Sequence, residues 1–232
     1  MSEEIRELQC VVDTLLSGRS GIKVLEAGCG SCMHIQMPKD AFVVGIDVSE
    51  KQLRKNFYAH EKILGDIQYY EPMISDFDLI ICWTVLEHLP QPERALKNFL
   101  RGIKDMGLIV LALPNVLSIK GLITKYTPYW FHVLVYRYLY GKRFAGEDEA
   151  GPFPTFLRFS MKPTSIKRFA AENGLSIEYF SMCESRFQKQ LKEKYQIVNH
   201  LWRIFEFILK TVTCDRISGS LTECIFVLQR RG

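Results

Sequence analysis

The sequence predicts a single α/β domain that covers residues 1–232 and is built on a mostly parallel β-sheet. Short apolar runs alternate with helical segments between residues 22 and 113, a rhythm typical of parallel strands joined by crossover helices. Glycine or acidic residues follow several of these runs. Ligands of parallel sheets bind at the carboxyl ends of the strands. A length of 232 residues with 47% hydrophobic residues suits one core with elaborations.

Four runs are short and apolar enough to be strands buried on both faces. They cover residues 22–26, 42–46, 77–82 and 108–113. One helix is predicted over residues 49–60 with Ser49 as its N-cap, and another over residues 91–103 with Pro92 in its first turn. Right-handed crossovers between the strands then produce the parallel sheet.

Composition excludes several classes of protein. The net charge of +4 is small for 232 residues, and the cations are scattered among 26 acids, so no nucleic-acid partner is expected. Seven cysteines at no framework spacing and an acidic amino terminus, "MSEEIRELQC", predict a reducing, cytoplasmic location. No run reaches the roughly 18 apolar residues of a membrane-spanning helix.

The turn in "KVLEAGCGSCMHI", residues 23–35, suits three kinds of chemistry. A dinucleotide site needs a third glycine where Met33 stands, so that pattern fails at its last position. A redox dithiol would use Cys29 and Cys32 at a helix start, where the helix dipole lowers a thiol pKa. That alternative leaves Glu26 unexplained, and no second cysteine pair completes a zinc site, so no metal is expected.

A third chemistry uses every unusual residue near this turn. Gly28 and Gly30 let the backbone pass close to a ligand, Glu26 offers a carboxylate to an ammonium group, and Asp47 at the end of the next strand can accept from two ribose hydroxyls. This set fits a cofactor with a free amine, a ribose and no phosphate. S-adenosylmethionine is such a molecule.

Five motifs resemble, in order and spacing, those of class I S-adenosylmethionine-dependent methyltransferases: "VLEAGCGSC", "VVGIDVSEKQL", "ILGDIQ", "FDLIICWTVLEHLPQPERAL" and "FLRGIKDMGLIVLALPN". The resemblance is strongest over residues 20–115 and points to the branch that holds the ubiquinone-biosynthesis O-methyltransferases and many small-molecule methyltransferases. It implies a Rossmann-like, mostly parallel seven-stranded sheet, with helices on both faces and a helical, aromatic insertion after the fifth strand.

The resemblance also implies which residues bind the cofactor. They are Glu26, Gly28, Cys29, Gly30, Asp47, Val48, Asp66, Ile67, Cys82 and Trp83. Glu26 and the two glycines would line the methionine portion, and Cys82 and Trp83 would close it on the other side.

The remaining residues of this set would hold the adenosine portion. Asp47 would bind the ribose with Val48 against the adenine, Asp66 would meet the adenine amino group, and Ile67 would cover a face of the ring. The chain departs from the family pattern at Cys32, which replaces a usual third glycine and narrows the turn.

His88 in "LEHLP" is the candidate catalytic residue. It follows the fourth strand, near the expected position of the donor methyl, and histidine can take a proton from a hydroxyl near neutral pH. The alternative is that His88 caps the following helix or packs on its loop.

Residues 115–160 interrupt the alternation of strands and helices. The segment "KYTPYWFHVLVYRYLYGKRF" is rich in aromatic residues, and "GPFPTFLRF" follows it. A connection of this length is usually functional, so we expect a lid or substrate wall that lines an aromatic or lipid-like acceptor pocket. A helical pair that only packs on the core is the alternative.

A second insertion is expected over residues 185–212, before the last strand. Its apolar residues recur at helical spacing: Ile197, Leu201, Ile204, Phe205, Ile208 and Leu209. Core packing is the first explanation. A homodimer contact or a peripheral membrane helix is the second, because Trp202 and Phe207 widen the apolar face.

These observations lead to one expected function and two alternatives. The expected function is methyl transfer from S-adenosylmethionine to a hydroxyl of a small natural-product, glycan or lipid-like acceptor. One alternative is a non-catalytic module that binds the cofactor as a regulator. The other is a C-x-x-C dithiol redox protein.

Overall fold

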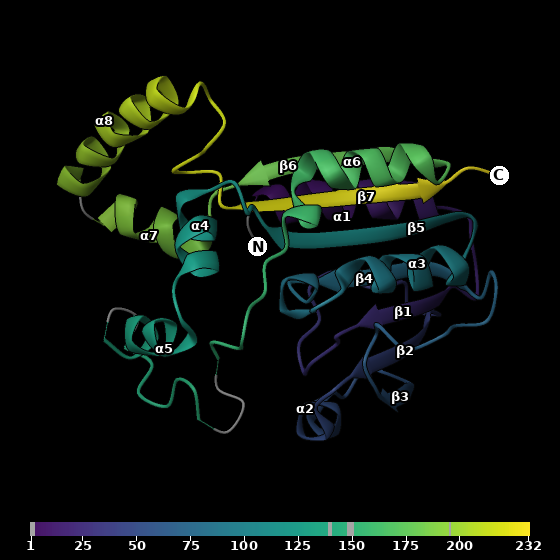
Figure 1. The fold of residues 1–232 in the computed structure, drawn as a ribbon. Helices are drawn as coiled ribbons and strands as arrows, with labels where there is room; N and C mark the ends of the chain where they lie inside the picture. The colour runs from purple at the N-terminus through teal and green to yellow at the C-terminus, as the bar shows by residue number, and fades with distance from the viewer. Residues whose placement is uncertain (1–2, 139–140, 148–150, 195) are drawn as a thin grey trace.

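The computed structural model describes residues 3–138, 141–147, 151–194 and 196–232. They form one seven-stranded sheet in the order β3-β2-β1-β4-β5-β7-β6, with helices on both faces (Figure 1). Neighbouring strands are parallel except at β7, which runs antiparallel to β5 and to β6. The predicted mostly parallel seven-stranded sheet is therefore confirmed.

The predicted strands and helices correspond to described elements, with small shifts of their ends. The strands are β1 (Lys23–Ala27), β2 (Phe42–Asp47), β3 (Glu61–Leu64), β4 (Phe77–Trp83), β5 (Ile103–Pro114), β6 (Leu175–Cys183) and β7 (Glu223–Arg230). The helices are α1 (Glu3–Leu16), α2 (Glu50–Lys55), α3 (Pro92–Gly102), α4 (Ile119–Tyr126), α5 (Tyr129–Tyr138), α6 (Pro163–Glu172), α7 (Arg186–Lys194) and α8 (Gln196–Thr213), and the 3-10 turns are η1 (Leu86–His88) and η2 (Phe159–Met161).

Helix α2 is shorter than predicted, for a reason found at its end. Its N-cap is Ser49, as expected, whose hydroxyl accepts from the Gln52 amide. The sequence predicts a helix that continues to His60, but the helix ends at Lys55. The Asn56 side chain accepts hydrogen bonds from the backbone amides of Tyr58 and Ala59 at 3.2 and 2.9 Å, which closes a turn at this point. An asparagine that bonds its own backbone in this way favours a turn over a helix.

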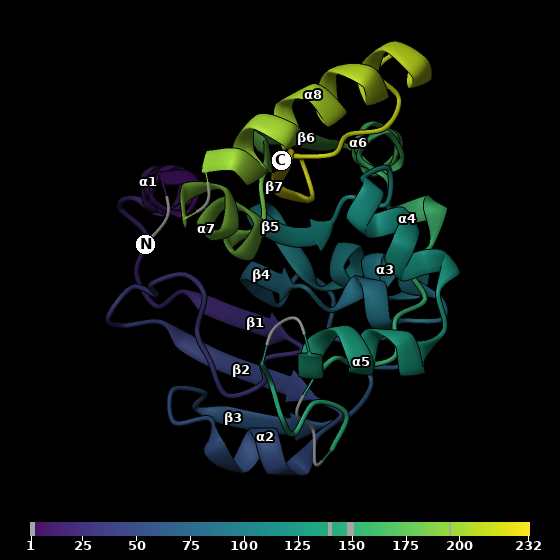
Figure 2. The same ribbon diagram turned by 90° about the vertical axis from the view of Figure 1, so that its left-hand side faces the viewer.

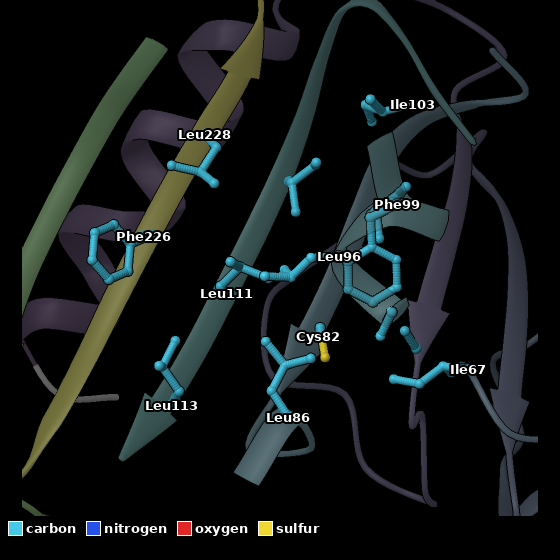
Figure 3. Close-up of a cluster of buried hydrophobic side chains, with 14 of the residues drawn as sticks. Ile67, Cys82, Leu86, Leu96, Phe99, Ile103, Leu111, Leu113, Phe226 and Leu228 are labelled. Carbon is cyan, nitrogen blue, oxygen red and sulfur yellow. The ribbon is translucent and has the colours of Figure 1, made fainter. Parts of the chain in front are cut away.

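The core has two layers, one on each face of the sheet. On one face, α3 and α6 pack Leu96, Phe99 and Ile166 against the apolar side chains of β4, β5 and β7. Figure 3 shows Leu96 and Phe99 in this cluster. On the other face, α1 contributes Leu8 and Val12 to the second cluster. Burying both faces explains why the central strands read as nearly continuous apolar runs.

The connection from β1 to β2 contains no helix between residues 28 and 41. It is fixed instead by side-chain contacts with α1: the Gln9 amide nitrogen donates to Gln36 O at 3.0 Å, and Gln9 Oε1 accepts from Gln36 N at 2.7 Å. The connection therefore begins with an open, irregular turn directly after β1.

Both expected insertions lie beyond the carboxyl ends of the parallel strands. Figures 1 and 2 show α4, α5, α7 and α8 on this side of the sheet. The interpretation of the α8 apolar residues as core is wrong for Leu201, Ile204 and Ile208, which are each more than half exposed. Leu209 is partly buried, and the side chain of Ile197 lies outside those that the structure describes. Among the described residues, no helix is long and apolar enough to cross a membrane.

Candidate functional site

Three turns meet at the carboxyl edge of the sheet, because β2, β1 and β4 are neighbours in it. The amide of Gly28 donates to Ile46 O at 2.8 Å, and the amide of Gly30 donates to the Asp47 carboxylate at 2.8 Å. Side chains after β4 reach the same place, since Val85 fills the space beside Gly28. Residues distant in sequence therefore form one continuous edge.

Glu26 is the most unusual group at this edge. Its side chain points from β1 into the protein and is only 3% exposed, and its Oε2 has no hydrogen-bond partner among the described residues. Burial raises the pKa of this carboxyl to about 8. A buried carboxyl without a partner is costly unless a ligand supplies one.

The two glycines have different reasons to be glycine. Both have left-handed backbone conformations, with φ of 73° at Gly28 and 50° at Gly30, which side chains other than glycine adopt with strain. A Cβ at Gly28 would collide with Val85, whereas a Cβ at Gly30 would enter open space. A ligand therefore has room to approach the backbone at Gly30, whereas glycine is required at position 28 because Val85 packs against it.

Asp47 ends β2 with both carboxylate oxygens engaged by amides. Oδ2 accepts from Gly30 N and Oδ1 accepts from Ser49 N, each at 2.8 Å. Each oxygen keeps further acceptor capacity, so the carboxylate can accept additional hydroxyl groups. The next side chain, Val48, is 71% exposed and available to a flat apolar ligand.

The two residues assigned to the adenine lie after β3. The Asp66 carboxylate accepts from the Gln68 amide and from the Gln68 side chain, each at 2.8 Å. The Ile67 side chain is buried in the core near Leu86 (Figure 3). Gly65 N donates to Asp47 O at 2.9 Å and so ties this turn to the end of β2. The assigned roles of Asp66 and Ile67 stay predictions.

Cys82 and Trp83, at the end of β4, point to opposite faces of the sheet. The Cys82 side chain is fully buried in the core layer next to α3 (Figure 3), so only its backbone faces the edge. Trp83 stacks on His34 with ring centroids 5.0 Å apart. Burial lowers the pKa of His34. This stack was not predicted from the sequence.

His88, in η1, is held in one orientation by the chain. Its Nδ1 lies 2.8 Å from Pro154 O, and because a carbonyl oxygen only accepts, Nδ1 carries the proton and Nε2 keeps the lone pair. Burial lowers the pKa of His88, although the bond to Pro154 opposes this shift. The imidazole is therefore neutral and able to accept a proton at Nε2 at neutral pH.

Residues 153–158, here called the strap, are the part of the first insertion that contacts His88 and its neighbours. The amides of Phe156 and Leu157 donate to Glu87 O at 2.8 and 3.0 Å, and Arg158 Nε donates to Pro90 O at 3.1 Å. Sequence reasoning placed residues 115–160 near the cofactor edge. The specific contact was not predictable, because Pro154 lies 66 residues after His88.

Glu87 is a second buried carboxyl that sequence reasoning did not single out. Its side chain is 6% exposed, its Oε2 lacks a hydrogen-bond partner among the described residues, and burial raises its pKa to about 8. Its Oε1 lies 4.0 Å from His88 Nε2. The "LEH" turn therefore places two titratable groups at the end of β4.

The environment of Cys29 does not suit a reactive dithiol. The side chain is buried, and burial together with the nearby Glu26 and Asp47 raises the thiol pKa to about 12. The residues that follow form no helix, so the helix dipole that would activate a thiol is missing from this turn. The burial of Cys29 and the lack of a helix after it both argue against the redox alternative.

Known proteins resemble this chain in sequence and in fold. Residues 2–179 match the methyltransferase domain family. A ubiquinone biosynthesis O-methyltransferase of Coxiella burnetii is 24% identical over 166 residues, covering 68% of this chain and 64% of that protein. One from Paracidovorax citrulli is 31% identical over 111 residues, covering 43% and 47%. The chain thus spans less than two thirds of the length of these curated relatives.

Solved structures of similar fold include two methyltransferases. One is phosphoethanolamine N-methyltransferase 2 of Haemonchus contortus in complex with S-adenosylmethionine, with a TM-score of 0.57 and 12% identity over 98% of this chain and 53% of that one. The other, a methyltransferase from Archaeoglobus fulgidus, has a TM-score of 0.53 and 17% identity over 98% and 94%. At such identities the likeness concerns the fold alone. The family match covers most of the chain, which therefore belongs to the methyltransferase domain family.

Proposed function

We propose that this protein transfers a methyl group from S-adenosylmethionine to a hydroxyl group of a small-molecule acceptor. The observation that carries the proposal is the buried carboxyl of Glu26, whose Oε2 has no hydrogen-bond partner among the described residues, on the same edge as the open turn at Gly30. Membership of the methyltransferase domain family supports the reaction class. The curated relatives named as O-methyltransferases support the choice of oxygen.

The chemistry of the edge residues fits the proposed cofactor. An ammonium group would give the Glu26 carboxyl the opposite charge that it lacks, which is the usual condition for an ionised group in a buried position. Asp47 retains acceptor capacity for two ribose hydroxyls, and the exposed Val48 offers an apolar surface to adenine. The open space beside Gly30 leaves room for the cofactor to approach.

His88 is the proposed proton acceptor. S-adenosylmethionine supplies a methyl group bound to a positively charged sulfur, and loss of the methyl group leaves that sulfur as a neutral thioether. As the acceptor oxygen bonds to the methyl carbon and the carbon–sulfur bond breaks, the hydroxyl proton passes to His88 Nε2. Pro154 O holds Nδ1–H throughout at 2.8 Å, so the imidazolium that forms keeps its orientation.

The first insertion is proposed to form the acceptor side of the site. The strap bears Phe153 and Phe156, both more than 40% exposed, and Phe153 packs edge-on against His88 with centroids 5.9 Å apart. Aromatic surface beside the proposed base favours an aromatic or lipid-like acceptor. Closure of α4, α5 and the strap over the edge would exclude water from the reaction.

A calorimetric titration with S-adenosylhomocysteine, the demethylated product, tests the cofactor site. Asp47→Ala should weaken binding by about 1.5 to 3 kcal/mol, because charge-assisted hydrogen bonds to two hydroxyls are lost. Asp105→Ala is the matched control, since Asp105 is an exposed acid that pairs with Arg230 at the opposite end of β5. Equal affinities in the two variants would refute the ribose assignment.

A further inference from the structure

Polar contacts hold helix α8 to the rest of the protein. Trp202 Nε1 donates to Ser220 Oγ at 3.1 Å, and the Glu206 carboxylate accepts from the hydroxyls of Ser218 and Ser220 at 3.4 and 3.1 Å. Lys192 lies over the Trp202 ring, 5.0 Å from its centroid. Hydrogen bonds, together with the Phe205 ring next to Gly219, therefore attach this helix to the loop before β7.

The apolar side of α8 faces away from the protein. Five side chains between 39% and 75% exposed make up what we call the α8 stripe: Leu201, Ile204, Phe205, Ile208 and Val212. Because successive residues are about 100° apart around a helix, these positions fall on one face. An ordinary surface helix does not leave a stripe of large apolar side chains this exposed, so the stripe needs a partner.

Helix α5 shows the same exposure on the same side of the molecule. None of its described residues is buried. The side chains at spacing i, i+4 and i+8, namely Trp130, Leu134 and Tyr138, are 42% to 84% exposed and form what we call the α5 stripe. Figure 1 shows α5 and α8 at the left of the molecule, beyond the carboxyl ends of the strands, and Figure 2 views them from that side.

Cations border both stripes. On α8 the exposed charged residues Arg203 and Lys210 are positive, while its acid, Glu206, turns inward with only 14% of its side chain exposed. The exposed residues Lys142 and Arg143 follow α5. Tryptophan and tyrosine favour the boundary between lipid headgroups and acyl chains, and flanking lysine and arginine are attracted to anionic headgroups.

We propose that the α8 stripe and the α5 stripe together dock on the surface of a bilayer that contains anionic lipid. Neither helix can cross a bilayer, so each would lie along the surface with its apolar side chains among the acyl chains. A second copy of the chain fits the stripes less well. In a two-fold dimer the same surface meets itself, which would bring the bordering cations of the two copies together.

Docking in this orientation would turn the carboxyl edge of the sheet, with His88, toward the lipid. An acceptor dissolved in the bilayer could then reach the site beneath the strap without crossing water. This consequence rests on the proposed methyl transfer, whereas the docking itself does not. Binding to vesicles in the absence of any cofactor separates the two proposals.

Co-sedimentation with vesicles tests the docking. The full chain should bind vesicles of phosphatidylcholine and phosphatidylglycerol, bind pure phosphatidylcholine far more weakly, and lose binding as salt is raised. The double variants Ile204→Ser/Ile208→Ser and Trp130→Ser/Leu134→Ser should each weaken binding at least about tenfold, because each removes two inserted apolar side chains. The control, Met73→Ser/Ile74→Ser, changes side chains that are even more exposed, in the loop before β4 at the other end of the strands.

The outcomes decide between lipid and a second copy. Since the altered side chains are exposed, melting temperatures should stay level. If a stripe variant does melt early, Arg203→Gln/Arg143→Gln replaces it and should weaken binding to anionic vesicles alone. The proposal is overturned if the parent binds no vesicles, or if the control loses as much binding as the stripe variants. It is also overturned if sedimentation velocity shows a dimer that only the stripe variants dissociate, with no vesicle binding.

Discussion

Replacing Glu26 by glutamine should remove a pH-dependent cost that the free protein carries. The pKa of Glu26 is about 8 in the folded chain against an ordinary value of 4.5. Above pH 4.5 the unfolded chain releases this proton, whereas the folded chain keeps it until about pH 8. The unfolding free energy is therefore at its full value below pH 4.5 and falls as the pH rises toward 8. Each pH unit between the two values costs about 1.4 kcal/mol, so the parent should lose about 3 kcal/mol of unfolding free energy by neutral pH.

Urea denaturation at a series of pH values measures this effect. Glu26→Gln has nearly the same shape and stays neutral. Between about pH 5 and pH 8 the variant should therefore lose roughly 3 to 4 kcal/mol less unfolding free energy than the parent. The buried Glu87 is present in both proteins and cancels in the difference. The variant should also bind S-adenosylhomocysteine more weakly, since the amide cannot pair with an ammonium group. If the unfolding free energies of variant and parent change in parallel with pH, or if the variant binds S-adenosylhomocysteine as tightly as the parent, Glu26 is not the carboxyl that pairs with the ammonium group.

Three further predictions address the base, the turn and the lid. His88→Ala should lower turnover roughly a hundredfold to ten-thousandfold while affinity for S-adenosylhomocysteine stays level. The parent rate should fall as the pH drops through the lowered pKa of His88, and a variant with nearly full turnover would leave His88 a structural role. Gly30→Asn should block cofactor binding, because the new side chain enters the open space beside the turn at a φ that asparagine tolerates. Gly18→Asn, the control, also stands at positive φ in open space and should leave binding unchanged. Equal affinities in the two variants would show that Gly30 is not part of the site. Amide hydrogens of α5 should exchange faster in the free protein than with cofactor and acceptor bound, and equal protection in both states would favour a fixed structural element over a lid.

The central fold was predictable because its signals are local. The strands β1, β2, β4 and β5 are apolar runs, and Pro92 begins α3 as its position in the sequence indicated. Strand β3 gave no such signal, since as an edge strand it exposes most of "EKIL". The premature end of α2 depended on side-chain hydrogen bonds of Asn56 that helix periodicity does not report.

The candidate site also combines residues that local motifs mark with contacts that the sequence does not reveal. Glu26, Gly30 and Asp47 could be singled out in the sequence because each lies at a strand end that a short motif marks, and a parallel sheet brings such ends together. Contacts between distant segments were out of reach, as with Val85 beside Gly28 and Pro154 on His88. The exposed α8 stripe shows a related limit, because periodicity reveals an apolar face but not what covers it.

Isothermal titration calorimetry of the parent protein with S-adenosylhomocysteine tests whether the carboxyl edge of the sheet binds the cofactor. We expect a saturable isotherm with one site per chain. We also expect a heat that changes with the ionisation enthalpy of the buffer near neutral pH, because the ammonium group of the ligand lowers the pKa of Glu26 and releases its proton. A folded chain that gives no saturable heat in buffers of different ionisation enthalpy would contradict this assignment of the cofactor site.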